Sequence, residues 1–267
     1  MRSRNRIPLI LGGGMLLFFL IAAAFPHVFA PYGRKEMFES WLEPCAEHLL
    51  GTNALGYDVF TELVYGAGDT LTIGLFASIL TLAVGTLMGT AAARTRAAGL
   101  LANGFINLFL LLPRLITLIV LSAFLGSSRI ALILLIAAFS WVGTARAVRA
   151  RVMWLQSRPF MEACTVQGLS RWHTAWYHIF PNLKDILLAR FLLGINSCMM
   201  MESTLSFLGF GDLYHPTWGT MMNFAYKRGA FMRHAYGYLL SPGICILLLS
   251  LSFYLLSLSR PQENQTS

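Results

Sequence analysis

The sequence predicts an all-α integral membrane protein with six transmembrane helices. Hydrophobic residues make up 56% of its 267 residues and charged residues only 12%, and the mean hydropathy is +0.62. A chain this apolar contains more hydrophobic residues than one water-soluble core can use. A helix crosses the hydrocarbon with about 20 mostly apolar residues, and six segments meet that condition: 7–26, 70–93, 103–125, 130–148, 185–206 and 237–258.

The first apolar segment sets the orientation of the chain. It follows Arg2, Arg4 and Arg6 as a signal peptide would, but its apolar run is long and no A-x-A cleavage pattern follows it. We therefore expect a retained helix with its N-terminus in the cytoplasm. Cytoplasmic segments then hold twelve Lys and Arg residues and outer segments six, in agreement with the positive-inside rule. Both termini are expected in the cytoplasm.

The connections divide the chain into three regions. Residues 1–69 hold the first transmembrane helix and an outer loop, residues 70–260 hold a core of five transmembrane helices, and residues 261–267 form a short cytoplasmic tail. The outer loop of about 40 residues is long for a simple connection. We expect a short amphipathic helix within it at about 58–66. In the second span, Gly74, Gly85 and Gly89 favour close packing between helices.

Composition and motifs argue against several functions. The net charge of +8 does not indicate nucleic-acid binding, because the basic residues are spread over short loops without an aromatic-interleaved basic face. No H-E-x-x-H, G-x-S-x-G or phosphate-binding G-x-x-x-x-G-K-[ST] pattern occurs, and the spans contain almost no Asp or Glu. A membrane hydrolase is therefore not expected, nor ATP hydrolysis by this chain. The cysteines fit neither a disulfide framework nor a metal site and are expected to pack: Cys45, Cys164, Cys198 and Cys245.

The cytoplasmic loop at 155–184, called the inner elbow below, is punctuated like two short helices. Ser157 is expected to cap the first helix, and Pro159 suits its first turn. Glu162 lies near the N-terminal end of that helix, where a negative charge favours the unpaired N–H groups. Gly168 offers a left-handed stop at its C-terminal end.

The second helix of the inner elbow is expected to begin at a Ser170 cap. It is expected to end at Pro181, which disfavours a helical Phe180 and turns the chain back to the membrane. On the first helix, the small residues Ala163 and Cys164 would let another protein approach the backbone closely. Because short interfacial helices with tryptophan also suit a lipid-surface anchor, the residues alone leave both interpretations open.

The spacing within the inner elbow resembles a known motif. Glu162-Ala163-Cys164, three residues and Gly168, followed by His178-Ile179-Phe180-Pro181-Asn182, is similar to the EAA loop of ABC importer permeases. The second part is similar to the dipeptide, oligopeptide and nickel branch of these permeases. Blocks at 51–67 and 202–219 resemble the same branch, so the resemblance covers about residues 50–220.

This resemblance implies a type I importer bundle in the bacterial cytoplasmic (inner) membrane. A second homologous permease subunit would pair with this chain, two ATP-binding-cassette ATPase subunits would dock beneath, and an extracytoplasmic solute-binding protein would deliver substrate. ATP and Mg²⁺ would be bound by the ATPases, with no cofactor in this chain. The substrate would be a small peptide or, alternatively, nickel or a metal chelate. The implied ATPase-coupling residues are Glu162, Ala163, Cys164, Gly168 and Pro181.

Two residues are candidates for the translocation path. Arg114 falls inside the third span just after Pro113, where a charge is costly, so we expect it to line the path or to pair with an acid of the partner subunit. Glu202 lies near the outer end of the fifth span and would contact substrate, gate the outer mouth or, as the favoured alternative, form a structural hydrogen bond. A stand-alone channel or secondary transporter would need charged or broken helices at mid-membrane, for which only Arg114 and Pro113 argue.

Substrate identity is not transferable from the family. Its members usually have Arg at the position of Tyr57 and commonly at that of Gly68. Soft ligands able to hold a transition metal are present, but consecutive methionines cannot all face one site, and ordinary packing is favoured. The residues concerned are Met199, Met200, Met201, Met221, Met222 and His215.

Overall fold

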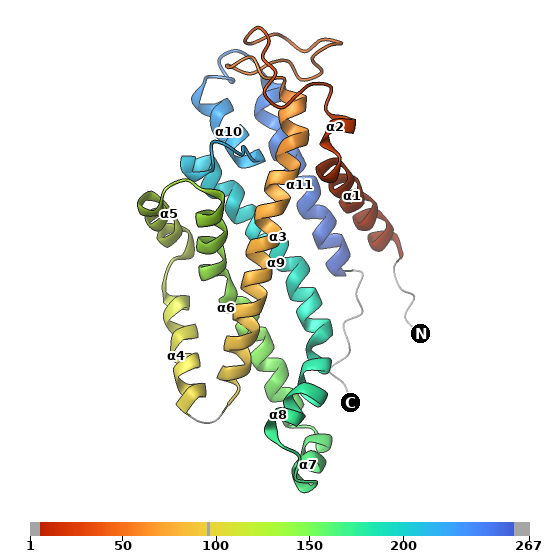
Figure 1. Cartoon of the computed structure of the whole chain (residues 1–267), viewed down its shortest axis with the longest axis vertical. Coiled ribbons are helices and arrows are strands. Elements are labelled where there is room, and N and C mark those ends of the chain that lie inside the picture. The colour runs from red at the N-terminus through yellow and green to blue at the C-terminus, as the bar shows by residue number, and fades with distance from the viewer. Residues whose placement is uncertain (1–5, 95–96, 259–267) are drawn as a thin grey trace.

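A computed structural model describes residues 6–94 and 97–258, which form a helical bundle (Figure 1). The predicted tail at 261–267 lies outside the described residues, as do Arg2 and Arg4. The elements in chain order are α1 (Arg6–Ala24), α2 (Pro26–Phe29), α3 (Val59–Ala92), α4 (Ala97–Leu111), α5 (Arg114–Leu125), α6 (Arg129–Gln156), α7 (Pro159–Val166), α8 (Arg171–Thr174), the π-helix η1 (Ala175–Ile179), the 3₁₀-helix η2 (Phe180–Leu183), α9 (Lys184–Leu205), the π-helix η3 (Ser206–Phe210), α10 (Trp218–Lys227) and α11 (Tyr236–Leu258).

Five of the predicted membrane crossings are helical segments long and apolar enough to span a bilayer, and a bent pair accounts for the sixth if it is one span. The five segments are Ile7–Ala24, Val59–Ala92, Arg129–Gln156, Ala175–Phe210 and Tyr236–Leu258. Helices α4 and α5 together are long and apolar enough for the sixth crossing and are bent by 86° at their junction. The outer loop and α7 lie at opposite ends of the long axis (Figure 1). The protein is therefore a multi-pass membrane protein.

The prediction of a separate helix at 58–66 is wrong, because residues from Val59 onward form the first turns of the 34-residue helix α3. Asp58 caps this helix, its Oδ1 accepting the Thr61 N–H at 2.7 Å. Trp218 holds the first turns in line with the rest of α3: its indole N–H donates to Leu63 O at 2.8 Å. A tertiary contact that the local pattern does not contain thus extends the second span outward.

The third span, predicted as one helix at 103–125, is interrupted. Helix α4 ends at Leu111, α5 begins at Arg114, and Pro113 between them has an extended ψ of 100°. Proline has no N–H for the helical hydrogen bond and its ring disfavours a helical residue before it. The chain therefore turns by 86° here and leaves Arg114 at the start of a new helix.

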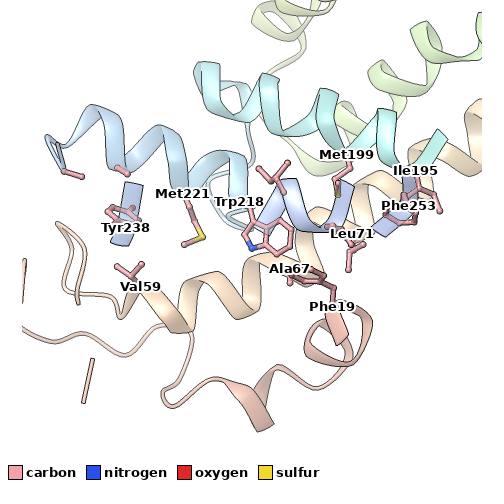
Figure 2. Close-up of a cluster of buried hydrophobic side chains, with 14 residues drawn as sticks. Phe19, Val59, Ala67, Leu71, Ile195, Met199, Trp218, Met221, Tyr238 and Phe253 are labelled. Atoms are coloured by element: carbon pink, nitrogen blue, oxygen red, sulfur yellow. The ribbon is translucent and has the colours of Figure 1, made fainter. Parts of the chain in front are cut away.

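Helix α3 is the central element of the bundle and packs against α1, α6, α9 and α10. Figure 2 shows the largest buried cluster, in which Trp218 points between Ala67 of α3 and Phe19 of α1. The rings of Trp218 and Phe19 stand edge to face with centroids 5.6 Å apart, a favourable aromatic geometry. This cluster joins α1, α3, α9, α10 and α11 at the outer half of the molecule.

The predicted role of small residues in close helix packing is confirmed. A β-carbon at Gly85 would stand 2.6 Å from Thr144 Cβ, and one at Gly89 would stand 2.5 Å from Ala145 O. At Gly74 the corresponding distance, to Met199 Cβ, is 3.1 Å. Helix α3 therefore approaches α6 and α9 more closely than any larger residue at these positions would permit.

Replacing Gly89 with leucine is expected to destabilise the bundle by about 3 kcal/mol, since the new side chain must displace the α6 backbone. Gly104→Leu is the matched control, because no atom lies within 4 Å of a β-carbon there. The measurement is the midpoint of thermal unfolding of the purified protein. Equal midpoints for the two variants would contradict the close approach of α3 and α6.

Candidate functional site

The inner elbow begins with α7, which ends in the predicted left-handed glycine. Gly168 has a φ of +68°, and the Leu169 N–H donates to Cys164 O at 3.1 Å, the hydrogen bond of a Schellman cap. No atom lies within 4 Å of a β-carbon at Gly168. Glu162 and Ala163 are exposed on α7, whereas Cys164 is turned inward at 7% exposure. The accessible surface of α7 and its cap therefore includes Glu162, Ala163 and Gly168 but not the Cys164 side chain.

Ser157 does not cap α7 as predicted. Its hydroxyl donates to Trp154 O at 2.9 Å, and its N–H bonds to Met153 O at 3.2 Å, so this residue ends α6. The prediction was wrong because α6 extends to Gln156, whose preceding turn offers unpaired carbonyl groups to the serine.

The second half of the inner elbow agrees with the prediction at its start and differs at its end. The Ser170 hydroxyl accepts the His173 N–H at 3.1 Å and caps α8 as expected. Pro181 does not end the helix: the chain passes through η1 and η2 directly into α9. The wider π turn and the tighter 3₁₀ turn accommodate the missing proline N–H, and the Asn182 side chain donates to His178 O at 2.7 Å.

The inner elbow is packed firmly onto the ends of two spans. Leu183 is fully buried against Val152 and Leu155 of α6, with Ile186 of α9 packed on the same cluster. On its outward side the elbow exposes apolar surface, with Val166 88% accessible. An element that is fixed to two spans and presents an apolar, capped helix to the cytoplasm can transmit movement from a docked partner.

A pocket opens among the spans beside the break between α4 and α5. It has a volume of about 410 Å³ and is lined by α3, α4, α5, α6 and α9. Arg114 lies at its wall and donates from Nη2 to Ser140 Oγ at 2.6 Å. Ser140 in turn donates to Ile136 O. This position at the wall of a cavity is compatible with the predicted translocation path, and the role of Arg114 stays a prediction.

Glu202 is fully buried at the outer end of α9. Its Oε1 accepts the hydroxyls of Ser206 at 2.6 Å and Thr217 at 2.7 Å, and its Oε2 accepts that of Ser203 at 3.3 Å. Thr217 also forms the capping box of α10 with Thr220. The favoured structural role of this carboxylate agrees with these contacts, since it ties the turn after α9 to the start of α10.

An ionic cluster at the outer end was not predicted. Asp69 of α3 binds Arg34 of the outer loop through Oδ2 and Arg129 of α6 through Oδ1. The Arg129 N–H donates to Asp212 Oδ2 at 3.2 Å. Burial disfavours ionisation of Asp212, but hydrogen bonds from the Tyr214 N–H, His215 and the Arg129 N–H outweigh it and lower the pKa of this carboxyl. The signal in the sequence was Asp69, an acid just before an apolar run.

The methionines singled out above pack rather than gather at a site. Met199 and Met221 are buried in the large hydrophobic cluster, and Met200 accepts the Ser250 hydroxyl at 3.4 Å. In the described part of the chain, no three His, Cys, Asp or Glu side chains lie close enough to hold a metal.

The two positions where the resembled family usually or commonly has Arg, Gly68 and Tyr57, lie in different places. Gly68 faces α1, where a β-carbon would stand 3.4 Å from Ala23 O. Tyr57 belongs to the outer loop, its N–H donating to Asn53 Oδ1 at 3.1 Å.

Five or six crossings, a pocket lined by arginines beside a broken span and a capped elbow at the inner face are together the features of a membrane permease. Residues 81–258 match the family described as binding-protein-dependent transport system inner membrane component. The chain belongs to this family, and it is a permease subunit of an ATP-binding-cassette importer. The resemblance drawn from the inner elbow is thereby confirmed.

Named relatives come from several bacteria. The dipeptide transport system permease protein DppC of Alkalihalophilus pseudofirmus is 32% identical over 212 residues, covering 79% of this chain and 69% of the relative. The di/tripeptide transport system permease protein DppC of Pseudomonas aeruginosa is 32% identical over 256 residues, covering 91% of this chain and 84% of the relative. The oligopeptide transport system permease protein OppC of Mycobacterium bovis is 30% identical over 217 residues, covering 78% and 73%.

Proposed function

We propose that this chain moves small peptides into the cell as a non-catalytic subunit driven by separate ATPases. The single observation that most directly supports coupling to an ATPase is the inner elbow, which presents an exposed and capped helix and is fixed to α6 and α9. The peptide substrate is supported by the relatives described above, which are named for dipeptides, tripeptides and oligopeptides. The family usually has Arg at the position of Tyr57 and commonly at that of Gly68. Because both arginines are missing here, the peptide that this chain prefers has to be measured.

The proposed assembly contains a second homologous permease, two ATP-binding-cassette ATPases and an extracytoplasmic solute-binding protein. ATP and Mg²⁺ are bound by the ATPases. On this chain, Glu162, Ala163 and Gly168 form the contact with one ATPase. Cys164 supports α7 from within, and Pro181 shapes the π and 3₁₀ turns that lead from the elbow into α9.

Import of nickel or a metal chelate is not favoured. The relatives are named for peptides, and the methionines that suggested a metal path are used in packing. A stand-alone channel would not need an exposed, rigidly packed helix at the inner face.

The test is purification of the tagged chain from its native membranes, followed by reconstitution into proteoliposomes. We expect a second permease and an ATPase to co-purify, and labelled alanylalanine to be taken up only with ATP and the binding protein. Uptake of a nickel chelate in place of the peptide would redirect the substrate assignment. An active species consisting of this chain alone would refute the importer assembly.

A further inference from the structure

The pocket beside the broken span contains two arginines from different helices. Arg114 lines it from the start of α5 and Arg190 from the inner half of α9, and the hydroxyl-bearing Ser197 of α9 is also part of the lining. Among the described residues, no Asp or Glu lines this pocket or the adjoining one, which Arg190 and Arg146 both line. Its volume of about 410 Å³ is within the range typical of small-molecule sites.

Within residues 6–94 and 97–258, the positive charges of both arginines lack a compensating acid. Arg114 has one neutral partner, Ser140, and its Nε is buried without a hydrogen bond. The Arg190 guanidinium lies beside Gly143 of α6, where a β-carbon would stand 3.9 Å from Nη1. Among the described residues, neither arginine forms an ion pair. Cations inside the membrane are costly unless an anion approaches them.

The break in the third span adds a further positive feature at the same wall. Because α5 begins at Arg114, its first turn borders the pocket. The first intrahelical hydrogen bond of α5 runs from the Thr117 N–H to Pro113 O at 3.1 Å. The N–H groups before Thr117 have no intrahelical acceptor, and the positive end of the helix dipole lies there. Broken helices in transporters present such ends to anionic groups of the substrate.

We propose that Arg114 and Arg190 form a carboxylate site that receives the C-terminal carboxylate of a peptide as it crosses the membrane. This inference rests on the proposed function, because it names the part of the substrate that the path holds. Guanidinium groups match the planar carboxylate and bind it through charge-assisted hydrogen bonds.

The terminal carboxylate is the anionic group that peptides of every sequence share. A path that must pass many side chains can bind this group without reading the sequence. Because no described acid lines the pocket for the ammonium end, the peptide lies with its carboxylate against α5 and α9. The same arginines also explain why a strongly apolar bundle can accept a zwitterion.

The experiment measures how fast a cysteine in the pocket reacts, and it uses the complete complex. Ser197→Cys is introduced with Cys45, Cys164, Cys198 and Cys245 replaced by alanine, and the nucleotide-free complex is placed in phosphatidylcholine nanodiscs, which carry no anionic lipid. Anionic and cationic methanethiosulfonate reagents are compared, with and without alanylalanine or its C-terminal amide. We expect the anionic reagent to be favoured roughly tenfold, and alanylalanine to protect far better than the amide.

Arg190→Gln and Arg114→Gln are each expected to remove most of the preference for the anionic reagent and most of the difference in protection between alanylalanine and its amide. Arg190→Lys is expected to retain part of both effects. Arg228→Gln, at an exposed outer position, is the control and should change neither. Equal protection by peptide and amide, or reagent rates unaffected by both Gln substitutions, would overturn the carboxylate site. An anionic-reagent preference that anionic lipid abolishes and that alanylalanine does not protect would assign the site to lipid headgroups instead. Uptake of alanylalanine by the wild-type complex, measured in parallel, reports separately on the proposed function.

Discussion

Replacing Gly168 with valine is expected to abolish ATP-driven uptake while the chain still inserts and assembles with its partner permease. Gly168 has a φ of +68°, which a β-branched residue adopts only with strain, so the Schellman cap of α7 would open. The surface offered to the ATPase would then change shape. We expect uptake to fall roughly 100-fold, at the upper end of typical coupling between two sites, with substrate-stimulated ATPase activity falling in parallel.

Gly229→Val is the matched control for backbone strain. Gly229 also has a positive φ, of +78°, and open space around its β-carbon position, but it lies in the outer half of the chain after α10. Gly168→Asn adds a second comparison, because asparagine tolerates the left-handed region and should retain most activity. Wild-type uptake and ATPase stimulation in Gly168→Val, or an equal loss in Gly229→Val, would show that the cap of α7 is not the coupling element.

Glu202→Ala is expected to lower the stability of the complex by about 3 kcal/mol, because three buried hydroxyls lose their acceptor. These hydroxyls belong to Ser203, Ser206 and Thr217. Transport should fall with stability, since the turn after α9 and the cap of α10 depend on the same carboxylate. The midpoint of thermal unfolding measures the first effect and peptide uptake the second.

Glu202→Gln separates a structural role from a role of the charge. The amide oxygen can accept from Ser206 and Thr217 in place of Oε1, and the amide NH₂ can donate to the Ser203 hydroxyl in place of Oε2. We therefore expect stability and uptake near those of the wild type. Loss of uptake at unchanged stability would instead identify the negative charge as part of the outer gate or of a substrate contact.

The sequence was a good guide where a local rule had no competitor. Gly168 has open space around it and nothing in the fold competes with its left-handed stop. Gly85 and Gly89 lie in an apolar span, where small residues mainly allow helices to pack closely. The six crossings follow from the length of apolar runs, which the bilayer thickness sets directly.

Two prolines show where local rules were insufficient. Pro113 interrupts a span predicted to be continuous, whereas Pro181 lies in a helical path predicted to end there. At Pro181 the fully buried Leu183 and the Asn182 hydrogen bond hold the chain in line. At Pro113 the chain instead turns, and Leu118 of α5 is fully buried in a cluster with α6. Which outcome occurs depends on tertiary packing, which a single sequence does not display.

The outer ionic cluster could not be predicted from the sequence for a related reason. Asp69 and Arg34 are 35 residues apart, and Asp69 and Arg129 are 60 apart. Neither separation has a helical or turn period, so only the folded bundle brings these residues together.

The helical path from Ala175 to Phe210, which includes π and 3₁₀ turns and a kink at Gly209, has a geometric consequence. This segment of 36 residues begins within the inner elbow and ends at the turn held by Glu202. At about 1.5 Å per residue it forms a rod of roughly 50 Å, so a tilt of about 5° at the cytoplasmic end displaces the far end by roughly 4 Å. That displacement exceeds the length of a hydrogen bond. A small rotation at the inner elbow is therefore enough to break the hydrogen bond from Thr217, which lies outside this segment, to Glu202 without any helix having to unfold.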